Sequence, residues 1–318
     1  MINKGFILFP GQGAQYPGMA LDLLEAKNEI KELFSLASDI SGMDMEDLLR
    51  NSSPEELKKT DISQPAITLA NLGAAKYLEL RGVKTLGCAG FSLGEYSALA
   101  LAGIISLEDC FLLVKERGEA MQRAVDNIQA LGQTPGKDPP GMAAVLGLSP
   151  SRVESLLAEW KIDELYTANI NSPRQLVVSG SSAALKEAEK RFKEAGARRV
   201  VILQVAGPFH SPLMKEAADL FAPALEKVNF RDPAIPVFSN VTGDKIKSGD
   251  EAKNLALRHI VEGVRWTDLE SSIAELKPEA LLEAGPGKVL QGLWKDLENG
   301  IPCHGAGTIE EIEELLKQ

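Results

Sequence analysis

The feature that most constrains the fold is the segment Gly90-Phe91-Ser92-Leu93-Gly94, which lies between a predicted strand at residues 85–89 and a predicted helix at residues 95–102. Small residues on both sides of a serine permit a turn so tight that the hydroxyl stands clear of the backbone. The N–H of Leu93 then begins the helix and faces any oxyanion that forms beside the serine. This context favours a nucleophilic Ser92 over a glycine-rich turn that merely contains a serine.

Short apolar runs alternate with helical stretches along the chain, and this pattern is typical of the α/β class. Residues 6–9 predict a buried strand that ends at Pro10 and Gly11. Apolar stripes predict helices over residues 21–37 and 63–79, and Gly82 lies just past the second one. Apolar runs at residues 237–238 and 281–282 continue the pattern, and residues 309–318 predict a final helix.

Residues 141–205 have a pattern of their own. The predicted order is strand, helix, strand, strand, helix, strand, at residues 142–146, 149–160, 165–170, 176–179, 181–195 and 199–205. This order is the ferredoxin-like arrangement. We therefore expect a small ferredoxin-like domain, residues 141–205, inserted into a large α/β-hydrolase-like domain with a parallel sheet core, residues 1–140 and 206–318. Residues 132–140, rich in Gly and Pro, predict the connecting loop.

The composition excludes several classes of protein. The formal net charge of −11 argues against nucleic acid as the main partner, because phosphate binding needs a basic surface. The first apolar run is too short for a signal peptide, and no window approaches the roughly 18 apolar residues of a membrane span. Cys88, Cys110 and Cys303 are odd in number and widely spaced, which predicts neither a disulfide framework nor a zinc site. We expect a cytoplasmic protein without a membrane partner.

A nucleophilic serine needs a general base, and histidine is the usual one because its pKa lies near neutrality. The chain has three histidines. His210 follows a predicted strand in the loop Phe209-His210-Ser211-Pro212, and loops at strand ends commonly carry chemistry. His259 lies in a predicted helix at residues 252–261, where a partly exposed surface residue is favoured. His304 lies near the C-terminus, where an α/β-hydrolase carries its base, so the residues favour His210 and leave His304 open.

Two further features give weaker signals from the residues alone. Gly11-Gln12-Gly13-Ala14-Gln15 follows the first predicted strand, but Tyr16 stands where a dinucleotide-binding fingerprint needs glycine. A tight turn is therefore favoured over a loop whose N–H groups lie near the serine. Arg117 lies in a predicted helix, where a single arginine is usually a solvated surface group.

Taken together, these motifs resemble the malonyl-CoA:acyl carrier protein transacylases of fatty acid synthesis and the related acyltransferase domains of polyketide synthases. The resemblance covers nearly the whole chain. Its motifs occur in fixed order at residues 9–15, 90–98, 117–118, 121–122, 168–173, 209–214, 239–243, 264–266 and 283–287.

The resemblance implies a role for each matching residue. Ser92 is the implied nucleophile and His210 its general base, while the backbone N–H groups of Gln12 and Leu93 form the implied oxyanion hole. Arg117 is implied to pair with the malonyl carboxylate, a role that suits a planar guanidinium offering two parallel hydrogen bonds.

The chain departs from the family pattern at two positions. Relatives usually have His where Phe91 stands, so no role is assigned to that side chain. Relatives usually have Gln at the position of His259, where a main-chain carbonyl orients the catalytic histidine. A backbone role survives this change of side chain. Phe209 resembles the malonyl-selecting form, and residues 127–140 are longer than the family pattern predicts.

The implied reaction transfers malonyl from malonyl-CoA to the phosphopantetheine thiol of holo acyl carrier protein through a malonyl-serine ester. The implied enzyme is a monomer that needs no metal or cofactor. Two alternatives remain open at this point. One is a serine esterase or thioesterase of α/β-hydrolase type that uses His304, and the other is a non-catalytic module that binds a carrier protein.

Overall fold

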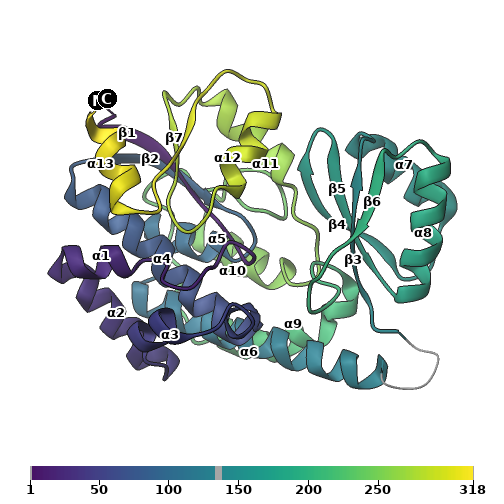
Figure 1. Cartoon of the computed structure of the whole chain (residues 1–318), viewed down its shortest axis with the longest axis horizontal. Coiled ribbons are helices and arrows are strands. Elements are labelled where there is room, and N and C mark those ends of the chain that lie inside the picture. Colours follow the sequence, from purple (N-terminus) through teal and green to yellow (C-terminus); the bar gives the residue numbers. More distant parts are fainter. Residues whose placement is uncertain (1, 133–137, 318) are drawn as a thin grey trace.

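Two separate β-sheets organise the chain (Figure 1). The structure is a computed structural model that describes residues 2–132 and 138–317. The first sheet has the strand order β2-β1-β7-β8, and each neighbouring pair of strands runs parallel. Its strands are β1 (Lys4–Phe9), β2 (Lys84–Gly90), β7 (Leu281–Glu283) and β8 (Cys303–Gly305). The predicted α/β class with a parallel sheet is confirmed.

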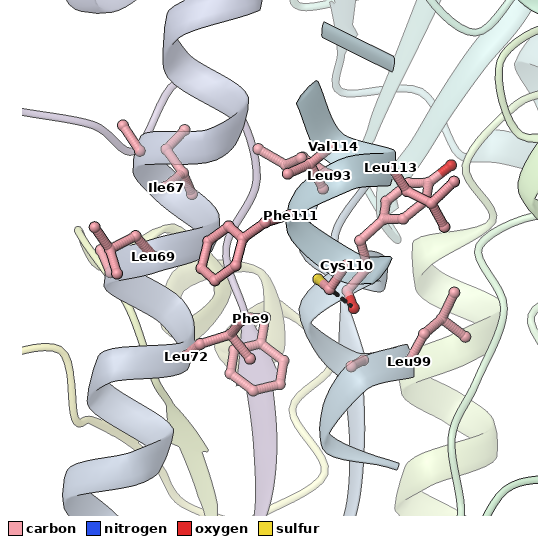
Figure 2. Packing of buried hydrophobic residues seen from close by; sticks show 14 of the residues in the cluster. Phe9, Ile67, Leu69, Leu72, Leu93, Leu99, Cys110, Phe111, Leu113 and Val114 are labelled. Atoms are coloured by element: carbon pink, nitrogen blue, oxygen red, sulfur yellow. Dashed lines mark hydrogen bonds between the residues drawn. The ribbon is translucent and has the colours of Figure 1, made fainter. Parts of the chain in front are cut away.

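Three helices form the core beside this sheet. They are α4 (Thr60–Leu80), α5 (Gly94–Leu101) and α6 (Leu107–Gly132). Helix α4 is apolar on nearly all sides, as expected of a helix enclosed by other elements. Figure 2 shows Phe111 of α6 pointing toward α4, and Leu72 of α4 beside Phe9 of β1. This packing fixes α5, which follows the Ser92 turn, against the end of β1.

The remaining helices of the part of the chain built on the first sheet pack around that sheet and the three central helices. They are α1 (Leu21–Ala26), α2 (Asn28–Ser41), α3 (Met45–Asn51), α9 (Lys215–Leu225), α10 (Gly249–Arg258), α11 (Trp266–Glu275), α12 (Val289–Asp296) and α13 (Ile309–Lys317). Helices α11 and α12 form a separate apolar cluster with β1 and β7. The predicted helix over residues 21–37 is divided, because Lys27 has an extended backbone with φ −147° and ψ 142°. The break lets α1 and α2 both contact α4. Within the described ranges, no helix has the length and apolar character that a bilayer crossing requires.

The second sheet is antiparallel and has the order β4-β5-β3-β6. Its elements are β3 (Gly141–Leu146), α7 (Pro150–Trp160), β4 (Leu165–Ser172), β5 (Gln175–Gly180), α8 (Ser182–Glu194) and β6 (Arg199–Ile202). Ser149 and Ser181 cap the two helices by accepting a backbone N–H. A separate apolar core joins the helices to the sheet, and the predicted order of elements for this segment is confirmed.

Three predicted boundaries differ from the structure. Strand β6 ends at Ile202 rather than residue 205, because Pro139 and Pro140 precede β3 and cannot donate to a longer pairing. Val237 makes an isolated bridge to Cys88 of β2 and begins no named strand. Helix α6 runs through residues 127–132, and residues 133–137 of the predicted connecting loop lie outside the described ranges.

The ends of β1 and β2 meet in very close contact. The N–H of Phe91 donates to the Phe9 carbonyl at 2.9 Å, which continues the pairing of the two strands into the turn. A methyl group on Gly94 would overlap the carbonyl oxygen of Phe9, and one on Gly11 would overlap the carbonyl oxygen of Phe91. Glycine is therefore required on both sides of this contact, which presses the loop after β1 against the serine turn.

This contact predicts different outcomes for two glycine substitutions. Gly94→Ala should destabilise the protein by about 1–3 kcal/mol, because overpacked backbone must shift. Gly292→Ala is the matched control, since Gly292 lies in α12 and its added methyl meets no described atom within 4 Å. This variant should gain about 0.5–1 kcal/mol from helix propensity. Thermal melts measure both changes, and a Gly94→Ala protein with the wild-type Tm would contradict the contact.

Candidate active site

Ser92 occupies a strained turn between β2 and α5. Its backbone has φ +50°, in the left-handed region that residues with a side chain rarely adopt. The Ser92 hydroxyl lies 2.8 Å from Nε2 of His210, and the Ser92 backbone N–H donates to Oδ1 of Asn240 at 2.8 Å. The turn thus holds the hydroxyl toward the imidazole, as the glycine pattern predicted.

His210 carries its proton on the nitrogen remote from the serine. Its Nδ1 lies 3.0 Å from the carbonyl oxygen of His259, and a carbonyl can only accept, so Nδ1 must donate. Nε2 is then the unprotonated nitrogen and accepts from the Ser92 hydroxyl. Burial, with the positive charge of Arg117, lowers the pKa of His210 to about 4. The imidazole is therefore neutral at physiological pH and able to take a proton.

His259 differs from the surface residue that its helical setting predicted. Helix α10 ends at Arg258, and His259 is fully buried just beyond it. Its ring stacks on that of His210, with centroids 5.0 Å apart. Neither ring nitrogen has a hydrogen-bond partner among the described residues. The prediction failed because the helix ends one residue before His259, where the chain turns inward to present its carbonyl to His210.

The backbone N–H groups of Gln12 and Leu93 lie on the two sides of the close contact described above. Gln12 follows Gly11, whose α-carbon abuts the Phe91 carbonyl, and Leu93 immediately precedes α5. Within the part of the chain that the structure describes, neither N–H has an acceptor. Free backbone N–H groups close to a serine turn are the kind of donor from which an oxyanion hole is built.

Arg117 is fully buried. The prediction of a solvated surface group, made from its helical position alone, was therefore wrong. Its Nη1 donates to Oε1 of Gln64 at 2.8 Å, and its guanidinium lies 5.5 Å from the centroid of the Tyr96 ring. Nε and Nη2 are buried without a hydrogen-bond partner in the described residues. A buried cation with two unused donors is costly unless an anion pairs with it, and these two donors match a carboxylate.

Three residues of the site received no role from the sequence. Asn240 contacts the serine turn, Glu95 contacts Asn240, and Gln64 orients Arg117. Glu95 is 2% exposed, and burial raises its pKa to about 7. A polar residue inside the apolar helix that follows Ser92 was the available signal for Glu95. Asn240 and Gln64 are 148 and 53 residues away from their partners, so no local pattern could reveal them.

The other candidates lie elsewhere. His304 is in β8 at the edge of the first sheet, and both β1 and β7 separate that strand from β2. The hydrogen bond from Ser92 goes to His210, which removes the reason for considering His304 as the base. Phe91 packs its ring against the edge of Trp266, with centroids 5.2 Å apart. No cluster of metal-ligating side chains occurs among residues 2–132 and 138–317.

The chain matches the acyl transferase domain family over residues 6–303. It is 36% identical to the malonyl CoA-acyl carrier protein transacylase of Haemophilus influenzae, over 99% of this chain and 100% of that protein. An acyl carrier protein S-malonyltransferase from Vibrio cholerae superposes with a TM-score of 0.90 at 34% identity, covering 98% of this chain and 99% of that one.

A second solved structure is a malonyl-transacylase in complex with its type II PKS acyl-carrier protein. It superposes with a TM-score of 0.89 at 34% identity and covers 99% of each chain. Similarity of this extent, in sequence and in structure, shows that the chain belongs to the acyl transferase family and, within it, to the malonyl CoA-acyl carrier protein transacylases.

Proposed function

We propose that this chain transfers malonyl from malonyl-CoA to the phosphopantetheine thiol of acyl carrier protein, through an ester on Ser92. The observation that carries the proposal is the hydrogen-bonded series from Ser92 to the His210 ring to the His259 carbonyl. This series prepares a serine hydroxyl for attack without a carboxylate. The relatives are malonyl transacylases, and one of them is solved with an acyl-carrier protein.

The first half-reaction charges the serine. Nε2 of His210 takes the hydroxyl proton as Oγ of Ser92 attacks the thioester carbon of malonyl-CoA. The N–H groups of Gln12 and Leu93 stabilise the oxyanion of the tetrahedral intermediate. As the carbon–sulfur bond breaks, the His210 proton passes to the departing sulfur. Coenzyme A leaves as its thiol, and malonyl remains as an ester.

The second half-reaction reverses these proton movements. The carrier thiol gives its proton to Nε2 of His210 and attacks the ester carbon. Collapse of the second oxyanion breaks the ester bond, and His210 returns the proton to Oγ of Ser92. Atoms and protons balance with these residues alone, so the proposed enzyme uses no cofactor of its own, and phosphopantetheine arrives on the carrier.

Arg117 provides the preference for malonyl. Its two unused donors lie in a buried setting where water does not compete, so a carboxylate gains two charge-assisted hydrogen bonds. An acetyl group offers no partner for them. Gln64 supports this role because it fixes one edge of the guanidinium and leaves the other edge available.

The division of the chain into two domains is consistent with the same function. We infer that residues 141–205 are a ferredoxin-like domain inserted into an α/β-hydrolase-like domain of residues 1–140 and 206–318; the strand order β4-β5-β3-β6 and the separate apolar core support this division. A cleft of about 520 Å³ beside His210 has walls from both units, including Leu157, Thr167 and Val241. We propose that this cleft binds the extended pantetheine arm of malonyl-CoA and of the carrier protein.

We also propose that the protein is a cytoplasmic monomer. The three cysteines form no disulfide, which fits a reducing compartment.

The proposed intermediate is testable by mass. Brief incubation with malonyl-CoA should add one malonyl group to the intact protein, and peptide mapping should locate it on Ser92. Ser92→Ala should remain unlabelled because it removes the hydroxyl that is hydrogen-bonded to His210. Malonyl on a cysteine, or rapid hydrolysis of malonyl-CoA without any thiol acceptor, would count against transfer and for a thioesterase.

The role of Arg117 predicts a change in acyl preference. Arg117→Ala should lower malonyl transfer by about 100-fold or more, the equivalent of two charge-assisted hydrogen bonds, and should affect acetyl transfer far less. Arg123→Ala is the control, since Arg123 is exposed on the same helix. Rates with both acyl-CoA substrates, on variants shown to be folded by thermal melts, decide the matter. Equal losses for the two substrates would make Arg117 structural.

The burial of His210 predicts the pH profile. The neutral imidazole is the active form, and a pKa lowered to about 4 keeps it neutral well below the usual histidine range. The kcat/KM of serine acylation should therefore stay nearly constant from about pH 8 to about pH 5 and fall below that. His304→Ala should give the same profile. An acid limb near pH 6.5 that persists in Glu95→Gln would show that the base is solvated and is not the buried His210.

A further inference from the structure

Asn240 bonds two backbone groups that flank Phe91, directly before the nucleophile in the chain. Its Oδ1 accepts the N–H of Ser92 at 2.8 Å, and its Nδ2 donates to the carbonyl of Gly90 at 2.6 Å. One planar carboxamide therefore holds the backbone that leads into Ser92, the central residue of the turn, whose φ is +50°. Asn240 is itself anchored, because its carbonyl accepts the N–H of Arg265 at 2.7 Å.

Glu95 determines which way the carboxamide points. Its Oε2 accepts both from the backbone N–H of Asn240 at 2.7 Å and from Nδ2 at 2.6 Å. Nδ2 thus faces two acceptors, the Glu95 carboxylate and the Gly90 carbonyl. A flipped carboxamide would place its oxygen against both of them and leave the Ser92 N–H facing an NH₂ group. The network permits one orientation, and in that orientation Oδ1 receives Ser92.

We propose that Asn240 and Glu95, here called the elbow clamp, are positioning residues that hold Ser92 in its attacking geometry and aim the neighbouring Leu93 N–H. This inference rests on the proposed nucleophilic role of Ser92. Neither side chain contacts the reacting atoms, so the elbow clamp acts through the backbone of the turn. A sub-ångström shift of that backbone would misplace the hydroxyl and the oxyanion donor together, which is costly for a preorganised site.

The charged and titratable groups around the elbow clamp come from four elements. Tyr96 lies next to Glu95 on α5, Arg117 approaches from α6, and His210 lies in the loop before α9. Nδ1 of His259 is 3.9 Å from Oε2 of Glu95. Arg117 favours the ionised form of Glu95, and burial opposes it, so the carboxylate is close to balance near neutral pH.

The decisive measurement is the rate constant of Ser92 acylation at saturating malonyl-CoA, read by rapid-quench mass spectrometry well below the Tm. Asn240→Ala should lower this rate constant by about 100-fold, the effect of losing one preorganised donor. The malonyl-CoA concentration for half-saturation should change little, because Arg117 is untouched. Glu95→Gln should retain most of the wild-type rate, because its carboxamide oxygen can accept both Asn240 donors. Glu95→Leu has no acceptor and should lose most of the rate.

The pH dependence of acylation by Asn240→Asp distinguishes a positioning role of Asn240 from a role in stability alone. It places two carboxyl groups within hydrogen-bond distance, and such a pair cannot ionise fully. A proton held between them replaces the lost N–H, so acylation by this variant should rise several-fold from about pH 8 to about pH 5.5. The wild-type rate should stay nearly constant over that range, because a protonated Glu95 still accepts both Asn240 donors through Oε2. This comparison remains decisive if Asn240→Ala fails to fold.

Glu283→Gln is the matched control. Glu283 is also a buried carboxylate that accepts two backbone N–H groups, but those belong to Leu290 and Gln291 at the start of α12. This variant should lower the Tm and leave the acylation rate unchanged. Folded Asn240→Ala with a wild-type rate, or Asn240→Asp with a flat pH profile, would overturn the elbow clamp.

Labelling of Ser92 by a fluorophosphonate separates this inference from the proposed function. The probe reports the reactivity of the serine without any malonyl group. A wild-type protein that reacts with the probe but not with malonyl-CoA would refute the malonyl function. In that case the same variants, compared by their labelling rates with the probe, would still confirm or overturn the elbow clamp.

Discussion

The contact between the α-carbon of Gly94 and the carbonyl of Phe9 is the constraint on which the site depends. It leaves no space for a side chain, so α5 begins directly against the end of β1. The matching approach of Gly11 to the Phe91 carbonyl brings the loop after β1, which continues with Gln12, close to the N–H of Leu93. In the proposed mechanism these two N–H groups, from distant parts of the sequence, are held by packing of the backbone and need no reorganisation when charge develops.

Both residues of the proposed nucleophile–base pair are held in unfavourable backbone conformations. Ser92 has φ +50° and His210 has φ +56°, and each such residue costs of order 1–3 kcal/mol. Other contacts offset this cost. The side chain of Asn240 bonds the backbone around Ser92, and the His259 carbonyl bonds the ring of His210. The short distance between hydroxyl and imidazole therefore reflects a local strain that the surrounding core maintains.

The sequence allowed much of this structure to be predicted. The glycine pattern around Ser92 and the alternation of apolar runs are local signals, and they predicted the serine turn, β1, β2, the apolar run of β7 and the elements of the second sheet, but not β8. The position of His210 after a predicted strand favoured it as the partner of Ser92, and its imidazole is the group that bonds the Ser92 hydroxyl. The burial of His259 and Arg117 was not predictable from the helical pattern around them, because burial depends on which face of a helix packs against an element distant in the sequence. The break at Lys27 was missed because its cause is the packing of two helices on α4.

The proposed role of Arg117 gives an acidic protein a means of binding an acidic substrate. The net charge of −11 repels an anion at long range, but exposed charges are screened within about 10 Å at ordinary salt. A buried guanidinium acts at contact distance, where the effective dielectric constant is low. Its fixed partner is the neutral amide of Gln64, which orients the group and leaves its charge intact. The nearby carboxylate Oε2 of Glu95 is bonded by Asn240, so it positions the nucleophile and does not occupy the donors of Arg117.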